Sequence, residues 1–273
     1  MMQRNYYYLV SGLPEIVLEQ SKAPFSLSEL VEQLREAMHP SDFQNIELIL
    51  LQWDNQNLLR WLQQDETNWA TPSNFSREML EAELREPERI PPYFVKFAEA
   101  YKNDEPIWAG MRWENQLTRL YYDYALAKTE GFLHQWFRFE QDLRNILTGW
   151  NSRQYEMQLD GQLIGQNEIT QAIAHNNSRD FGLAREVEFM DKLEQALERD
   201  DLLEREQAID YIRWNYITTL NTFHYFSTEV VLGYFLRFIL LDRWLRLSAK
   251  RGKDRIEQYL QKMEEKYKNL VTT

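Results

Sequence analysis

Apolar residues recur at steps of three and four along most of the chain, which predicts amphipathic helices. The stretch 132–150, FLHQWFRFEQDLRNILTGW, shows this pattern with an acid and an amide beside the apolar stripe. The stretch 51–62, LQWDNQNLLRWL, shows it again upstream. Both stretches contain Asp-x-x-Asn at the same phase, as Asp54–Asn57 and Asp142–Asn145. The shared motif predicts an internal repeat.

A third copy of the motif is weaker. A shift of 100 residues places Asp242 on Asp142, but Leu245 then falls where Asn145 stood, so the amide is lost. Polar stretches at 65–76 and 151–180 separate the copies. We therefore expect two to three similar helical bundle units, approximately 1–75, 76–165 and 166–273. The predicted structural repeat motif comprises Asp54, Asn57, Arg60, Asp142, Asn145 and Asp242.

Start and stop signals support a helical chain. Ser26 with Glu29 is a capping-box pattern, and Pro40 ends the helix that begins there. Ser41 or Asp42 is expected to cap the next helix. The segment Tyr6–Leu13 reads as a short strand or as an extended lead-in to a helix. Later helices are expected over 77–85, 93–101, 108–124, 132–150, 168–174, 186–205, 210–226, 228–247 and 254–270.

Composition narrows the fold class and the functions. The 273 residues contain only nine Gly and eight Pro, which favours an all-α protein over a sandwich or barrel. The formal net charge is −12, so binding to nucleic acid or to an anionic membrane surface is disfavoured. The local exception is the basic stretch 243–255. The chain has no Cys, which excludes disulfides and thiolate metal sites.

No segment predicts a membrane anchor. The most apolar stretch, Val230–Leu241, is interrupted by Arg237, is too short to span a bilayer, and is expected to be a buried helix. The N-terminal segment has no small-residue cleavage site before Glu15, so it is interpreted as part of the mature protein.

The chemistry-bearing residues favour a non-catalytic protein without a cofactor or metal. No phosphate-binding loop or nucleophile elbow is present, and four His residues lack metal-protease spacing. The acid pairs Glu81 with Glu83 and Glu140 with Asp142 are interpreted as solvated helix faces rather than acid–base groups. His134 is interpreted as a hydrogen-bonded imidazole at the edge of the core. The Asp-x-x-Asn pairs fit a packing and hydrogen-bond motif, with a ligand site as the alternative.

Four stretches together carry a resemblance to a known family. They are the opening YYYLVSGLP, the first motif with its following Leu-Leu-Arg60, the second motif with Ile-Leu, and the late stretch EVVLGYFLRFILLDRWLRL. The chain resembles a bacterial family that is encoded with the components of V/A-type rotary ATPases. That family is similar to the V-type ATPase C subunit, which is the d subunit of the eukaryotic pump. The resemblance implies three helical units around a pseudo-threefold axis in a funnel-like arrangement.

The resemblance also implies a function. The chain would be a non-catalytic central-stalk (rotor) subunit that couples the rotor shaft to the membrane proteolipid ring. Its partners would be the shaft subunits and the ring. It would be cytoplasmic and held at the inner face of the membrane through protein partners. The alternative is a helical adaptor or assembly factor that binds protein partners without being part of the rotor.

Overall fold

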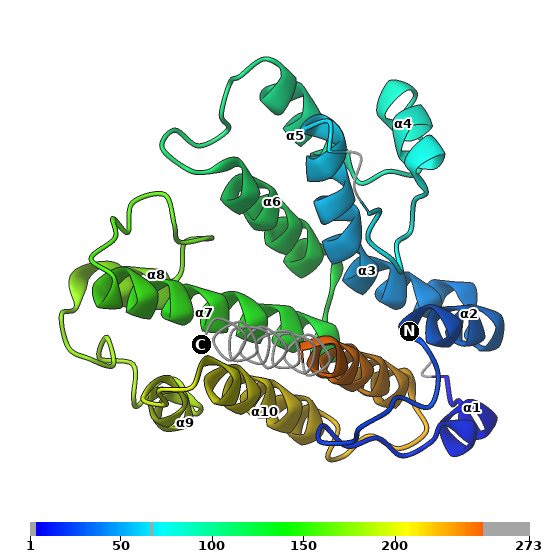
Figure 1. Ribbon diagram of the computed structural model, residues 1–273. Coiled ribbons are helices and arrows are strands. Elements are labelled where there is room, and N and C mark those ends of the chain that lie inside the picture. Colours follow the sequence, from blue (N-terminus) through cyan, green and yellow to red (C-terminus); the bar gives the residue numbers. More distant parts are fainter. Residues whose placement is uncertain (1–3, 66–67, 248–273) are drawn as a thin grey trace, which may run out of the picture. The chain divides into compact units, whose positions relative to one another are not determined.

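Helices make up the regular structure of the chain. The structure is a computed structural model that describes residues 4–65 and 68–247. Within these residues no strand occurs, and one isolated antiparallel bridge joins Asn5 to Ser227. The all-α class is therefore confirmed. The helices are α1 (Tyr7–Gly12), α2 (Leu27–Ala37), α3 (Pro40–Leu62), α4 (Arg77–Arg85), α5 (Pro92–Lys102), α6 (Trp113–Lys128), α7 (Gly131–Gln154), α8 (Glu168–His175), α9 (Met190–Leu197), α10 (Leu202–Leu220), and the helical residues 228–247, called here the 228–247 helix (Figure 1).

The described chain forms two compact units. The first unit contains residues 4–33 and 199–247, and the second contains residues 34–198 apart from the two residues that are not described. The first unit thus joins both ends of the described chain. These bounds differ from the three expected units, 1–75, 76–165 and 166–273, and the threefold division and the funnel stay predictions.

Local capping rules explain where α2 and α3 begin. The Ser26 Oγ accepts from the Glu29 N–H at 3.2 Å, and the Glu29 carboxylate accepts from the Ser26 N–H at 2.7 Å. This confirms the capping box. Helix α3 begins earlier than expected: its cap is His39, whose ring accepts from the Ser41 N–H, rather than Ser41 or Asp42. Pro40 fits the first helical position because no helical bond requires its missing N–H.

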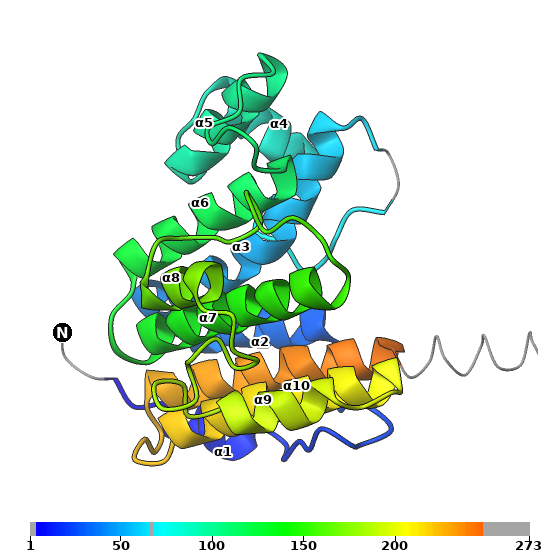
Figure 2. The same ribbon diagram turned by 90° about the vertical axis from the view of Figure 1, so that its left-hand side faces the viewer.

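The second unit is built on α3, α5, α6, α7 and α8. Helix α3 packs against α5 and α6, α6 packs against α7, and α7 packs against α8 (Figure 2). Gly149 permits the last of these contacts, because a Cβ there would lie 2.5 Å from the Ile173 Cγ2 atom. The core of this unit includes the fully buried side chains Ile46, Leu50, Leu58, Phe94, Phe97, Leu143 and Ile146.

The first unit is built around the 228–247 helix. This helix lies beside α10 in both ribbon views (Figures 1 and 2). Phe25, which precedes α2, stacks on Phe238 with ring centroids 5.1 Å apart. The core also includes Leu18, Leu30, Val231 and Phe235, each at most 1% exposed. Residues 230–241 thus form the buried helix that their composition predicts.

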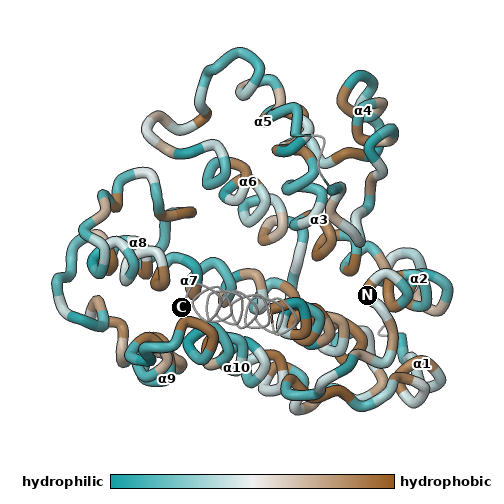
Figure 3. Tube along the Cα trace, in the orientation of Figure 1, coloured by the Kyte–Doolittle hydropathy of each residue, from teal (hydrophilic) through white to brown (hydrophobic). Residues whose placement is uncertain are grey.

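Hydropathy along the chain matches this packing. Hydrophobic and hydrophilic positions alternate along the helices, as expected for elements that each bury one face (Figure 3). Over the described residues, no helix combines the length and apolar character needed to cross a membrane.

Some local expectations differ from the structure or fall outside it. Residues 7–12 are helical rather than extended, and the chain enters α1 with the Tyr6 N–H donating to the Phe226 carbonyl. The charged stretch 186–205 holds α9 and only the first turn of α10, which continues to Leu220, because Asp201 caps α10 through the Leu203 and Glu204 N–H groups. The helix expected over 254–270 lies outside the described residues.

Candidate functional site

The first Asp-x-x-Asn motif ties α3 to the loop that follows it. Asn57 is fully buried, and its Nδ2 donates to the Ala70 carbonyl at 3.0 Å. The Ala70 N–H donates back to the Asn57 Oδ1 at 2.7 Å. The Asn57 side-chain amide thereby exchanges two hydrogen bonds with the Ala70 backbone, as the backbone of a neighbouring β-strand would. Arg60 adds a bond from its guanidinium to the Asn68 carbonyl.

Asp54 binds the far end of the same loop. It is 1% exposed and accepts from the Asn74 and Phe75 N–H groups at 3.0 and 3.1 Å. It also accepts from the Asn74 Nδ2 at 2.7 Å. The next residue, Ser76, caps α4. The carboxylate therefore sets where the loop ends and where α4 begins.

The second motif makes the matching contacts on α7. Asn145 is fully buried; its Nδ2 donates to the Ile164 carbonyl at 2.8 Å, and the Ile164 N–H donates to its Oδ1 at 2.9 Å. Asp142 accepts from the Asn167 Nδ2 at 2.7 Å, and Asn167 caps α8. Arg138 lies 3.6 Å from the Asp142 carboxylate. In both motifs the amide binds the middle of the loop and the acid binds the residues that start the next helix.

Asp242 does not make this contact. It lies on the 228–247 helix, is half-buried, and pairs with Arg246 one turn away. The buried acid of the first unit is instead Asp210 on α10, which is 0% exposed. Asp210 accepts from Arg213 at 3.1 Å and from Arg243 of the neighbouring helix. Sequence reasoning missed Asp210, although Asp210-x-x-Arg213 has the spacing of the other two motifs.

The remaining candidate groups are also engaged. Glu81 accepts from the Trp61 Nε1 at 3.0 Å, and Glu83 is buried and accepts from the N–H groups of residues 88–90, so the interpretation of Glu83 as part of a solvated face was wrong. The His134 Nδ1 lies 3.2 and 3.1 Å from the carbonyl oxygens of Leu126 and Thr129, which agrees with a hydrogen-bonded imidazole. In the described ranges, no three His, Asp or Glu side chains gather as metal ligands would.

Comparison with known proteins assigns the family. The family model described as "Protein of unknown function (DUF2764)" matches residues 2–267. The chain belongs to the DUF2764 family. A relative from Chlamydia muridarum (strain MoPn / Nigg), described as "Uncharacterized protein", is 23% identical over 169 residues. That alignment covers 60% of this DUF2764 chain and 62% of the relative, which is less than two thirds of its length. No solved structure matches the chain.

The family match corrects the resemblance drawn from the sequence. The family model that matches nearly the whole chain is DUF2764, which is described as of unknown function, and neither it nor the Chlamydia relative is described as a rotary ATPase subunit. The resemblance depended largely on apolar positions of amphipathic helices. Such positions agree between unrelated helical proteins because every buried helix face repeats at steps of three and four. Part of the quoted opening motif lies in α1, which is one more short helix.

Burial changes the acidity of Asp54, Asp142 and Asp210 in this DUF2764 chain. Removal from water raises the pKa of Asp54 to about 7, against which the N–H donors of Asn74 and Phe75 act only partly. Burial likewise raises the pKa of Asp142, opposed by Asn167 and Arg138. Burial also raises the pKa of Asp210, opposed by Arg213 and Arg243. The fold thus holds three acids whose ionisation costs free energy.

We expect Asp54 to make stability depend on pH. Its folded-state pKa is raised from 3.8 to about 7, so its contribution is fully present below the ordinary pKa and is lost as pH rises through about 7. At about 1.4 kcal/mol per pKa unit, the free energy of unfolding should lose on the order of 3–5 kcal/mol across this range. Asp54→Asn removes this titration. Urea unfolding between about pH 5 and pH 8 should show the variant gaining stability relative to wild type as pH rises.

Glu99→Gln is the matched control for that series, because Glu99 is exposed on α5. Its difference from wild type should stay constant over the same pH range. A constant difference for Asp54→Asn as well would show that Asp54 does not titrate there.

The net charge of the chain is concentrated in one unit. Residues 34–198 contain 28 acidic and 16 basic residues, a net charge of −12. The other residues, 1–33 and 199–273, contain 15 of each and are neutral. Many acids of the second unit are exposed and make no described contact; examples are Glu36, Glu86, Glu99, Glu105 and Glu188. The second unit is therefore the strongly acidic part of the molecule.

Proposed function

We propose that this chain is a non-catalytic helical adaptor that binds a basic protein partner through its second unit. The observation that carries the proposal is the segregation of charge, because all of the net −12 belongs to residues 34–198. An acidic domain attracts a basic protein and repels nucleic acid and anionic lipid. The partner is thus expected to present Lys and Arg side chains.

The hydrogen bonds of the buried polar groups support a non-catalytic role. Asp54, Asn57 and Asn145 bind loop peptide groups, and Asp210 binds two guanidinium groups. A general acid or base must reach a reactant within hydrogen-bond distance. These groups instead reach the protein's own loops and helices, so they stabilise the fold.

A central-stalk role in a V/A-type rotary ATPase is one specific form of this proposal and stays a prediction. In that case, the basic partner would be the tip of the rotor shaft or basic loops of the proteolipid ring. The adaptor role requires only that the acidic unit meets a basic protein surface.

Affinity capture with charge variants tests the proposal. The tagged chain should recover a basic protein from cell extract at about 0.05 M salt and lose most of it at about 0.5 M, because salt screens attraction between exposed charges. Replacing exposed acids of the second unit should lower recovery several-fold; suitable changes are Glu86→Gln, Glu88→Gln, Glu186→Gln and Glu188→Gln. Recovery of shaft and ring subunits in the eluate would favour the central-stalk role over the general adaptor role.

Glu15→Gln with Glu19→Gln is the matched control, because both acids are exposed and belong to the first unit rather than to the acidic second unit. This pair should leave recovery unchanged. Recovery that is independent of salt, or equal losses for both sets of variants, would refute binding through the acidic unit. A saturable rise in melting temperature with Mg-ATP or NAD would refute the non-catalytic role, since ligand at about 100 times its Kd adds about 2.7 kcal/mol.

A further inference from the structure

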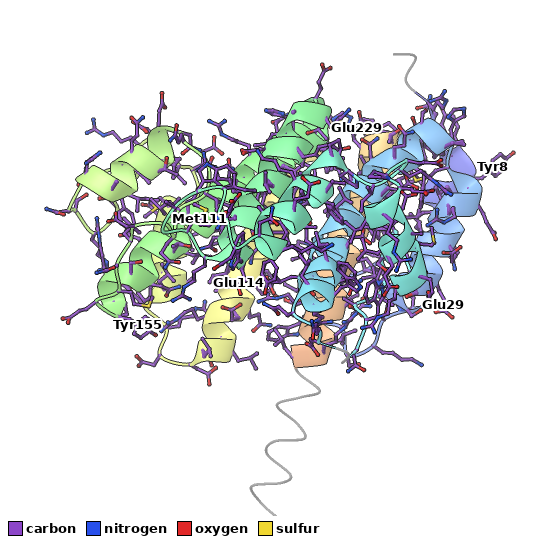
Figure 4. All side chains as sticks on the ribbon, turned by 90° about the horizontal axis from the view of Figure 1, so that it is seen from above. Tyr8, Glu29, Met111, Glu114, Tyr155 and Glu229 are labelled. Carbon is purple, nitrogen blue, oxygen red and sulfur yellow. The ribbon has the colours of Figure 1, made fainter. Side chains whose placement is uncertain are left out.

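Five exposed aromatic side chains gather in the first unit. Tyr7, Tyr8, Phe223, Tyr225 and Phe226 are 56, 96, 88, 74 and 37% exposed, and they are called here the aromatic cluster. They account for half of the ten large hydrophobic side chains that are exposed in the described chain. Tyr8 extends away from the helix that carries it (Figure 4). Such a concentration of exposed rings marks an interaction surface rather than scattered surface residues.

Backbone contacts hold the two segments of the cluster together. The Tyr6 N–H donates to the Phe226 carbonyl, and Asn5 bridges Ser227. The Tyr7 and Phe226 rings lie 4.9 Å apart. Turn bonds also order residues 221–227, with the His224 N–H donating to the Asn221 carbonyl at 3.0 Å. The rings are therefore presented on a preorganised backbone, which lowers the entropy lost on binding.

The exposed area of the cluster is close to one side of a stable interface. The five exposed fractions amount to between three and four whole aromatic residues. At about 150–250 Å² for each, this is roughly 500–900 Å². A standard protein interface buries about 800 Å² per partner, and the largest apolar patch on a typical monomer is about 300–600 Å².

The chemistry of the cluster is complementary to itself. No described residue hydrogen-bonds the hydroxyls of Tyr7, Tyr8 or Tyr225, and a phenol both donates and accepts. The segments 4–13 and 221–229 contain one Arg and one Glu, so the surface around the aromatic cluster carries no net charge from these segments. An anionic membrane would require a basic surround, which these segments lack. A second neutral Tyr- and Phe-rich surface meets no repulsion from this one.

We propose that the aromatic cluster is the contact surface of a symmetric homodimer, occupied by the same cluster of a second copy of this chain. In a two-fold contact the same patch is used on both copies, so a self-complementary surface suffices. The aromatic rings supply apolar burial, and the Tyr hydroxyls pair at the rim.

The effect of salt distinguishes dimer formation through the aromatic cluster from binding of a basic partner to the second unit. The acidic second units of two copies repel each other, and salt screens that repulsion. Dimer formation should therefore strengthen with salt, whereas binding of a basic protein to the second unit should weaken. A variant that loses dimer formation but keeps binding of a basic protein, or the reverse, therefore tests the two proposals separately.

Sedimentation velocity of the full chain tests the dimer. Between about 1 and 100 µM, a range that brackets micromolar Kd values, the mass should rise from one copy toward two, with a lower Kd at high salt. The triple variant Tyr8→Ser, Phe223→Ser, Tyr225→Ser should weaken association at least tenfold. The control Tyr155→Ser with Met157→Ser, exposed on the second unit at 62 and 54%, should leave it unchanged. Circular dichroism verifies that each variant is folded.

Cross-linking tests the same contact without removing it. The natural chain has no Cys, so single Phe223→Cys and Tyr155→Cys variants each carry one thiol. A short bis-maleimide should link two copies of Phe223→Cys several-fold more than two copies of Tyr155→Cys. A monomeric wild type across the concentration range would overturn the proposal, as would a triple variant that dimerises like wild type. Co-sedimentation with phosphatidylglycerol vesicles that the triple variant loses would also overturn it, and would assign the cluster to a membrane.

Discussion

Replacing Asn145 by Leu is expected to lower the free energy of unfolding by roughly 2–6 kcal/mol. The Asn145 side chain both donates to the Ile164 carbonyl and accepts from the Ile164 N–H, and Ile164 is itself fully buried. Leu can satisfy neither group. A buried polar group left without a partner costs about 1–3 kcal/mol, and two groups are left here. Urea or thermal unfolding measures the loss directly.

Two companion variants make the result specific. Asn151→Leu lies on the same helix at an exposed position and should change stability by less than about 0.5 kcal/mol. Asn57→Leu removes the equivalent pair of bonds to Ala70 and should cost a comparable amount. If Asn145→Leu behaves like Asn151→Leu, the amide does not hold the loop.

Replacing Asp210 by Ala is expected to cost about 3–5 kcal/mol, the range for breaking a buried ion pair by removing one partner. Asp210 is fully buried and lies between the guanidinium groups of Arg213 and Arg243. Its removal takes one carboxylate from both Arg213 and Arg243, and Arg243 keeps Glu206. The loss should appear in the urea unfolding midpoint, and the double variant with Arg243→Met should lose less than the sum of the two single changes.

Asp242→Ala is the matched control for Asp210→Ala, because the internal shift of 100 residues places Asp242 as the acid of the third motif. It forms an ion pair with Arg246 across one turn, and Arg246 is 62% exposed. Pairs of this kind contribute about 0–1 kcal/mol. A larger cost for Asp242→Ala than for Asp210→Ala would reverse the assignment of the buried acid in the first unit.

Most helices could be predicted from sequence because their signals are local, whereas the loop residues that the Asp-x-x-Asn motifs bind could not be named from the sequence. The capping box of Ser26 and Glu29 spans four residues, and apolar spacing located most helices to within a few residues. The Asp-x-x-Asn motifs bind loop residues that follow within 25 positions. Their shared phase was visible in the sequence, and a packing role was the favoured interpretation. Whether two whole bundles superpose stays a prediction.

Other features depend on which helix faces meet. Spacing sets the phase of a residue about the axis of its own helix, but the neighbour that covers that face is chosen by tertiary packing. The internal shift of 100 residues therefore selected Asp242 as the third acid. In the structure, packing of α10 against the 228–247 helix instead buries Asp210 against Arg243. The joining of residues 4–33 to 199–247 is likewise a long-range result.

The exposed aromatic side chains of the first unit are a further feature that the sequence alone does not predict. The sequence predicts a helix over 210–226, but α10 ends at Leu220, and Phe223 and Tyr225 are exposed although large apolar side chains are usually buried. Sequence by itself determined the all-α class, the capping box of Ser26 and Glu29, and the approximate positions of most helices, since capping and apolar spacing involve near neighbours. Tertiary structure alone decided which acid is buried in the first unit and which aromatic residues face solvent. Both depend on contacts between segments distant in the sequence, such as the Tyr6 bond to Phe226.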